Sequence, residues 1–271
     1  MIVRTVETLR RVSAHTSFAS LALAAGAFLY ASQAFAAPIN YGDFAGATVT
    51  YTQVTEDANS AGDAPPLFGP PTVSGDSLDF DPVGFSASAT GAGGVDITDG
   101  NLRFGIVAKP GGAINQVMLN EAGDTTLAGF GTDATFTAVT ARGVISITGV
   151  DGAGINVVST PFSMTFSPSG GTYGLGTDGG GGPLYAADWS GGIAIDVDAI
   201  LTSKNIPFNL GATKVSINLD NTLIALSQNG TFSLIAKKDF GGLSVTVNIP
   251  EPSTVLMLGL ASIGLVIARR K

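Results

Sequence analysis

The sequence predicts an all-β protein, an antiparallel β-sandwich of jelly-roll-like type, and three observations lead to this fold class. Short runs rich in β-branched and aromatic residues recur about every ten residues, with glycine- and proline-rich turns between them. Within several runs, such as 102–107 and 213–220, apolar side chains alternate with polar or small ones, as in strands with one buried face. The chain also contains 37 glycines and only 13% charged residues among its 271 positions, which suits a β protein with many turns.

The first elements are expected before residue 120. Proline pairs and glycine clusters divide this part of the chain into runs of strand length. The predicted elements are an opening strand at 46–56, a loop at 57–71, an edge strand at 72–82 that continues through 85–90, a strand at 96–108, a turn at 110–112 and a returning strand at 114–120.

The middle of the chain holds further strands and one glycine-rich interruption. Strands are expected at 127–130, 135–150 and 155–166. The interruption at 168–183 is predicted to be a mobile loop and the main boundary within the folded region. It contains a literal G-x-G-x-x-G, but the Gly-Gly-Gly-Pro that follows cannot begin the helix that a dinucleotide site requires.

The last part of the folded region is predicted to close the sheets. A strand that gives way to a short helix is expected at 193–201, and a half-buried strand begins at Thr213. Asn229-Gly230 is typical of a type I′ hairpin turn. A closing strand at 243–249 leads directly into the C-terminal tail.

Composition excludes several kinds of site. The chain has no cysteine, so it can form neither a disulfide nor a thiolate metal site. Its single histidine, His15, lies in the N-terminal segment, which leaves residues 37–248 without a histidine base or zinc ligand. That region carries nineteen acidic residues against seven basic ones, so nucleic acid is a poor partner.

Residues 1–36 have the pattern of a secretory signal peptide. A basic region contains Arg4, Arg10 and Arg11, and an apolar segment at 18–30 follows it, which we expect to be helical. The small residues Ala34 and Ala36 form an A-x-A cleavage site, so the mature chain is expected to begin at Ala37. This pattern implies the Sec translocon and signal peptidase as partners.

Residues 249–271 have the composition of a C-terminal membrane anchor. The rigid segment Pro250-Glu251-Pro252 precedes an uncharged apolar run at 254–268, and a basic cluster that includes Arg269 and Arg270 ends the chain. A single transmembrane helix is predicted at about 254–268. Its fifteen residues would span roughly 22 Å, less than the bilayer's hydrocarbon core, so the anchor is short.

This tail resembles the PEP-CTERM sorting signal found in Gram-negative bacteria that produce exopolysaccharide. The resemblance covers about 22 residues and rests on the Pro-Glu-Pro, apolar and basic elements in that order. Ile249 and Val255 depart from the residues most frequent in the family, outside the Pro-Glu-Pro core. The resemblance implies recognition by an exosortase, a membrane protein thought to cleave its clients, with Pro250, Glu251, Pro252, Arg269 and Arg270 as the sorting residues.

Two low-specificity ligand sites are candidates in the folded region. Asp76, Asp79 and Asp81 offer hard oxygen ligands that could hold calcium at a sheet edge, although aspartates in turns more often accept hydrogen bonds from the backbone. Tyr173, Tyr185 and Trp189 surround the glycine-rich stretch and could stack on sugar rings, if their faces are exposed rather than part of the core.

Glycoside hydrolysis is the enzyme class that needs neither histidine nor cysteine, since two carboxyl groups suffice. Asp196 and Asp198 are the candidate pair, expected on one face of a strand. No motif selects them as catalytic.

Together these patterns predict a non-enzymatic, exported protein with three regions: a signal peptide at 1–36, an extracellular β-sandwich at 37–248 and a sorting tail at 249–271. We expect a membrane-tethered intermediate at the inner membrane, then a place at the cell surface or in an extracellular, biofilm-type matrix. The role would be structural or glycan-associated, with exopolysaccharide as a partner and no cofactor. The alternatives are a calcium-assisted carbohydrate-binding module and an aspartate-dependent glycoside hydrolase.

Overall fold

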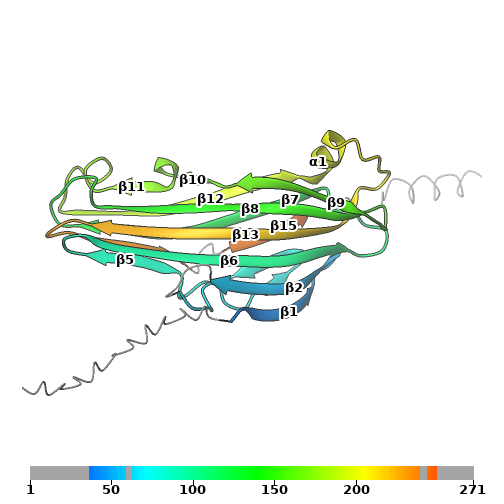
Figure 1. Ribbon diagram of the computed structural model, residues 1–271, viewed down its shortest axis with the longest axis horizontal. Helices are drawn as coiled ribbons and strands as arrows, with labels where there is room; N and C mark the ends of the chain where they lie inside the picture. Colours follow the sequence, from blue (N-terminus) through cyan, green and yellow to red (C-terminus); the bar gives the residue numbers. More distant parts are fainter. Residues whose placement is uncertain (1–36, 59–62, 239–242, 249–271) are drawn as a thin grey trace, which may run out of the picture. The chain divides into compact units, whose positions relative to one another are not determined.

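The computed structural model describes residues 37–58, 63–238 and 243–248, and they form two antiparallel β-sheets that share one core (Figure 1). This confirms the predicted all-β sandwich. The jelly-roll-like connectivity stays a prediction, and the helices expected at both ends of the chain lie outside the described residues.

The first sheet is built around three long strands. Its order is β1 (Ile39–Ala45), β2 (Val49–Ala58), β6 (Gly94–Ala108), β13 (Ala212–Ser227), β8 (Phe136–Val150) and β11 (Thr172–Gly174), and β9 (Ala153–Ser163) also pairs with β8. Along much of these strands inward-facing residues alternate with outward-facing ones, and apolar side chains predominate on the inward face at 102–106 of β6 and 215–219 of β13.

The second sheet packs behind the first one. Its order is β10 (Thr165–Ser167), β12 (Leu184–Asp196), β7 (Gln116–Ala128), β15 (Leu243–Asn248), β4 (Ser77–Phe80) and β3 (Thr72–Ser74), and β14 (Phe232–Lys237) pairs with both β7 and β5 (Ser86–Thr90). Among the described residues there are also two short helices: a 3-10 turn, η1, at Ser169–Gly171 and α1 at Val197–Ser203.

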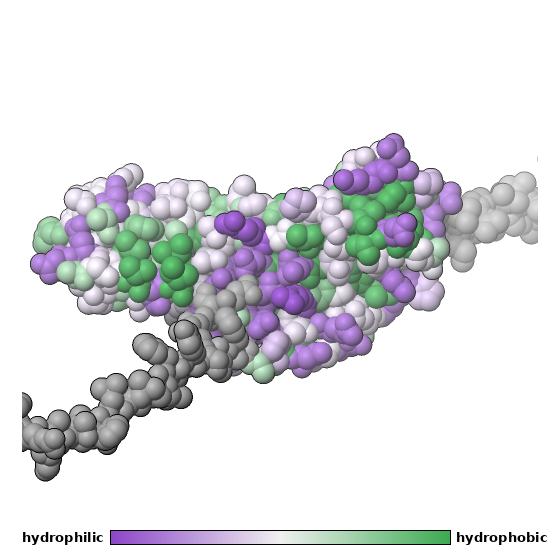
Figure 2. All heavy atoms as spheres, viewed as in Figure 1, coloured by the Kyte–Doolittle hydropathy of each residue, from purple (hydrophilic) through white to green (hydrophobic). Residues whose placement is uncertain are grey.

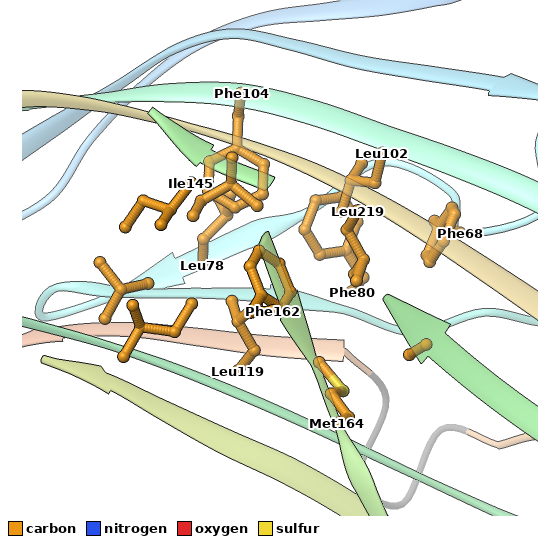
Figure 3. Close-up of a cluster of buried hydrophobic side chains, with 14 of the residues drawn as sticks. Phe68, Leu78, Phe80, Leu102, Phe104, Leu119, Ile145, Phe162, Met164 and Leu219 are labelled. Carbon is orange, nitrogen blue, oxygen red and sulfur yellow. The ribbon is translucent and has the colours of Figure 1, made fainter. Parts of the chain in front are cut away.

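The core lies between the two sheets and draws large apolar side chains from both (Figure 3). Leu102 and Phe104 from β6 and Leu219 from β13 face Leu78, Phe80 and Leu119 of the second sheet. The predicted alternation on 102–107 and 213–220 is confirmed, because Leu102, Phe104, Val215 and Ile217 are buried. Burial of this apolar area is the main force that holds the sheets together.

Several strand boundaries differ from the predictions because the chain turns back or changes sheet at points that the sequence pattern does not mark. The run 72–82 is a hairpin of β3 and β4 rather than a single strand, and β5 pairs with β14 instead of continuing it. The run 155–166 divides at the buried Met164, which lies between β9 in the first sheet and β10 in the second. The segment after Pro110 likewise leads to the other sheet, where β7 runs without a break through 127–128.

The turn at Asn229-Gly230 is real, but it is not a β-hairpin. Thr231 N donates to Gln228 O, and only Gly230 of the two central residues has a positive φ, whereas a type I′ turn requires two. The flanking strands β13 and β14 belong to different sheets. The turn therefore connects the two layers of the sandwich.

The glycine-rich stretch 168–183 is folded into the first sheet, so the prediction of a mobile loop at a boundary is wrong. It supplies β11, which pairs with β8, and it buries Tyr173 and Leu175 in the core. Asp178 accepts a hydrogen bond from Gly174 N at 2.7 Å, and Asp133 accepts one from Thr177 N at 2.7 Å. These carboxylates hold the backbone of a segment whose glycines provide little packing of their own.

Candidate functional site

A shallow groove lies on the outer face of the first sheet. Figure 2 shows hydrophilic residues at the middle of the face formed by β8, β13 and β6, between two more hydrophobic patches. The groove has a volume of about 940 Å³, and its polar lining comes from five residues: Asn101, Arg142, Asn218 and Asp220 of these strands and Ser163 of β9. Val144 and Pro161 line its apolar side.

A chain of hydrogen bonds orders the polar side of the groove. Arg103 Nε donates to Asn101 Oδ1 at 2.6 Å, and Asn101 Nδ2 donates to Asn218 Oδ1 at 2.7 Å. Asn101 is only 4% exposed, so its amide is held in one orientation, while Arg103 and Asn218 remain exposed to solvent. The result is a fixed row of amide and guanidinium groups across β6 and β13.

Two carboxyl groups lie close together beside this row. The Asp99 and Asp220 side chains are hydrogen-bonded to each other, and Thr222 Oγ1 lies 3.4 Å from Asp99 Oδ1. Burial raises the pKa of Asp99 to about 6, and the neighbouring Asp220 and Asp63 carboxylates act in the same direction. Asp99 therefore holds a proton at mildly acid pH, where an ordinary aspartate is ionised.

Stability is expected to fall as the pH rises from about 4 to about 6, because the folded chain binds the Asp99 proton more tightly than the unfolded chain does. In Asp99→Asn this decline should be smaller, and the melting temperature at pH 7 should exceed that of the wild type. Thermal unfolding followed at several pH values measures both effects. Asp188→Asn, at an exposed position of β12, is the matched control. An unchanged pH slope in Asp99→Asn would contradict the assignment.

The carboxyl groups do not have the spacing of a glycosidase. Asp99 and Asp220 are in hydrogen-bond contact, closer than the about 5 Å or more that separates the two carboxyl groups in such enzymes.

The expected pair Asp196 and Asp198 does not share a strand face. Asp196 caps α1 by accepting a hydrogen bond from Ala199 N at 2.8 Å, and Asp198 lies in the helix and accepts one from Asn115 Nδ2 at 2.6 Å. The prediction of a same-face pair is wrong because the strand ends at Asp196.

The three aspartates proposed for calcium do not gather into one group in the part of the chain that the structure describes. Asp76 accepts hydrogen bonds from Thr48 N at 2.7 Å and Val49 N at 3.2 Å, which ties the β3–β4 turn to the start of β2. Burial raises the pKa of Asp79, with a further contribution from Asp81. Within the described part of the chain, no three histidine, cysteine, aspartate or glutamate residues form a group that could hold a metal ion. Calcium at this edge stays a prediction.

Two of the three aromatic residues predicted to stack on sugars are in the core. Tyr173 is 0% exposed and Trp189 is 2% exposed, with the Trp189 ring packed edge-on against Phe166 at 5.9 Å. The prediction of a stacking surface is therefore wrong for Tyr173 and Trp189, whose faces are covered by other side chains. Tyr185 is half-buried against the same core.

The predicted processing sites lie almost entirely outside the described residues. This applies to Ala34 and Ala36 and to the sorting residues Pro250, Glu251, Pro252, Arg269 and Arg270. Ala37 is described and exposed, two residues before β1 begins. No helix in the described ranges is long and apolar enough to cross a membrane, and the predicted span at 254–268 falls beyond them.

The groove residues escaped prediction because long-range register brings them together. Asn101 and Asn218 are 117 positions apart, and only the pairing of β6 with β13 makes them neighbours. The available signal was the polar character of alternate positions on both strands, which by itself indicates only a solvent-facing side.

Comparisons with known proteins give a specific match for the tail and distant structural similarities for the sandwich. No curated protein matches the chain. Among solved structures, the enzymatically active domain of tailspike protein 4 from bacteriophage CBA120 is 13% identical over 74% of this chain, with a TM-score of 0.21. The structure of infectious bursal disease virus Gt strain is 12% identical over 73% of this chain, with a TM-score of 0.13. This chain spans only 19% of the tailspike chain and 49% of the viral one, and neither similarity supports an argument about function.

The end of the chain gives a specific match. The PEP-CTERM protein-sorting motif matches residues 248–271, which begin at the last residue of β15 and include the Pro-Glu-Pro segment, the apolar run and the basic cluster. This chain therefore ends in a PEP-CTERM protein-sorting motif, which implies processing by an exosortase.

Proposed function

We propose that this chain is an exported protein of the cell surface or extracellular matrix, whose β-sandwich has a non-catalytic role in association with exopolysaccharide. The observation that carries the proposal is the sorting motif, which follows the last strand of the folded region without a linker. In this proposal the Sec pathway exports the chain, signal peptidase removes 1–36, and the tail tethers the sandwich to the inner membrane until an exosortase processes it.

The groove on the first sheet is the proposed glycan contact. Its amide, guanidinium and carboxyl groups can donate to and accept from sugar hydroxyls, and Val144 and Pro161 offer apolar contact beside them. The hydrogen bonds that fix Asn101 reduce the entropy lost on binding, because its amide is already oriented.

Polysaccharide binding tests this proposal. In the double variant Asn101→Ala/Asn218→Ala, affinity for the exopolysaccharide of an exosortase-containing bacterium should fall roughly tenfold or more, since each lost hydrogen bond contributes about 1 kcal/mol. Asn120→Ala is the matched control, because Asn120 is exposed on a strand of the second sheet. Equal binding by both variants would remove the groove from the proposal.

The same assay separates the alternatives. Binding that disappears with a chelator and returns with calcium would favour a calcium-assisted module. Release of shortened glycans during the incubation would favour a hydrolase. The absence of any binding would leave a purely structural role.

A further inference from the structure

Three polar side chains meet inside the core, on strands that belong to both sheets. Glu121 on β7 and Lys237 on β14 have side chains that are 0% exposed, and Asn221 on β13 is buried opposite them. Lys237 Nζ contacts Glu121 Oε2. Asn221 Nδ2 donates to Glu121 Oε2 at 2.7 Å and to Oε1 at 2.9 Å. One carboxylate oxygen therefore touches both the lysine amine and the asparagine amide.

The surroundings of this triad are apolar and aromatic. Lys237 Nζ lies 4.8 Å from the centre of the Phe85 ring and 5.1 Å from that of Phe68, and these two rings pack edge to face. Burial lowers the pKa of Lys237, and the opposing effect of Glu121 does not reverse it. The uncharged amine, which is the nucleophilic form, is therefore easier to reach than in an exposed lysine.

As a purely structural feature the triad is costly. A buried ion pair contributes little net stability, because desolvation of both charges offsets their attraction. Asn221 Oδ1 is also buried without a hydrogen-bond partner among the described residues. The arrangement has the three groups that amide exchange needs: an amine, an amide carbonyl, and a carboxyl group in contact with the attacking and leaving nitrogen atoms.

We propose that Lys237 and Asn221 become joined by an intramolecular isopeptide bond between Nζ and Cγ, with Glu121 as the acid–base residue. No oxidant, metal or cofactor is required.

The reaction balances within the triad. The Lys237 ammonium first passes a proton to the Glu121 carboxylate, which leaves a neutral amine and a neutral carboxylic acid. The Nζ lone pair then forms a bond to Asn221 Cγ, and the carbonyl oxygen takes up the displaced π electrons. As the carbonyl re-forms, the Cγ–Nδ2 bond breaks. Glu121 gives its proton to Nδ2 and takes one from Nζ, so ammonia leaves and a secondary amide remains beside a protonated Glu121.

The proposed bond would connect the two sheets. Asn221 lies on a central strand of the first sheet, and Lys237 ends a strand of the second one. The chain contains no cysteine, so it cannot link the two sheets by a disulfide, whereas an amide bond between side chains can link them covalently. Such a bond would also survive reducing conditions.

Intact-mass spectrometry of the denatured wild-type protein is the decisive test. The measured mass is compared with the mass calculated from the sequence between the first and last residues of the purified protein. We expect a deficit of one ammonia molecule in essentially every chain. Trypsin should fail to cut after Lys237 and should release residues 215–238 as one peptide, since no other lysine or arginine lies between 215 and 236. Fragmentation of that peptide should give no ions from breaks between 221 and 237, where the bond closes a ring.

Variants separate this bond from other sources of ammonia loss. Glu121→Gln, Lys237→Met and Asn221→Leu should each restore the full mass. Asn229→Ala should keep the deficit, and it controls for succinimide formation at Asn229-Gly230, which also releases ammonia. The proposal is overturned by a wild-type protein of full calculated mass that trypsin cuts after Lys237. A deficit that persists in Lys237→Met, or that disappears in Asn229→Ala, would overturn it as well.

Discussion

Replacing Glu251 with alanine is expected to leave the exported protein with an unprocessed C terminus. Pro250 and Pro252 each fix one φ angle and lack a backbone donor, which disfavours the interior of a helix or a sheet for this sequence, and Glu251 is the only charge among the three residues. Removal of Arg269 and Arg270 should have the same effect, because basic residues hold the end of an anchor on the cytoplasmic side. Intact-mass analysis of the protein from exosortase-containing cells measures the processed fraction, which should fall from nearly all chains to nearly none.

The control for this experiment lies in the same tail. Ser253→Ala changes a neighbouring residue but leaves the Pro-Glu-Pro segment and the basic cluster unaltered, so its processing should match that of the wild type. A wild-type protein that keeps residues 249–271 in such cells would count against processing at this motif.

The β-sandwich could be predicted from local sequence because alternation reports directly on burial. β6 and β13 show this, since the apolar residues at 102–106 and 215–219 are the ones that face the core. Pairing and sheet membership could not be predicted in the same way. The residues before and after Met164 alternate between buried or half-buried and exposed positions without a break, yet they belong to different sheets. The chain passes from one sheet to the other at the buried Met164 side chain, and the alternation of inward- and outward-facing residues continues across that point, so the sequence pattern does not reveal the change.

The polar core residues were also hidden by their local context. At 232–237 the apolar residues Phe232 and Leu234 suggest one buried face, but Ser233, Ile235 and Lys237 on the other face are the most deeply buried residues of the strand. Lys237 reaches the interior because Glu121, 116 positions away, lies on the neighbouring strand. From sequence alone a charged residue in a strand is expected to face solvent, because the partner that allows its burial cannot be identified.

Glu56 offers the largest expected effect on stability. It is fully buried, and its carboxylate accepts hydrogen bonds from the backbone N–H groups of Leu67, Phe68 and Gly69 and from the Tyr41 hydroxyl at 2.6 Å. One side chain thus attaches the loop before β3 and the edge strand β1 to β2. The loop also carries Phe68, which packs at the centre of the aromatic core cluster.

Glu56→Ala should lower the free energy of unfolding by about 3–5 kcal/mol, because four donors lose their acceptor and the two buried ones, the N–H groups of Leu67 and Phe68, cost about 1–3 kcal/mol each. For a domain of this size that corresponds to a fall of roughly 10 °C in melting temperature. Glu56→Gln keeps the shape but turns an amide donor toward other donors, so it should recover only part of the loss. Urea unfolding measures both variants against Asp57→Ala, whose side chain accepts from the adjacent Ala58 N–H at 2.9 Å. If Glu56→Ala unfolded at the same urea concentration as Asp57→Ala, the carboxylate would not be what holds the loop, and packing of Phe68 alone would have to anchor it.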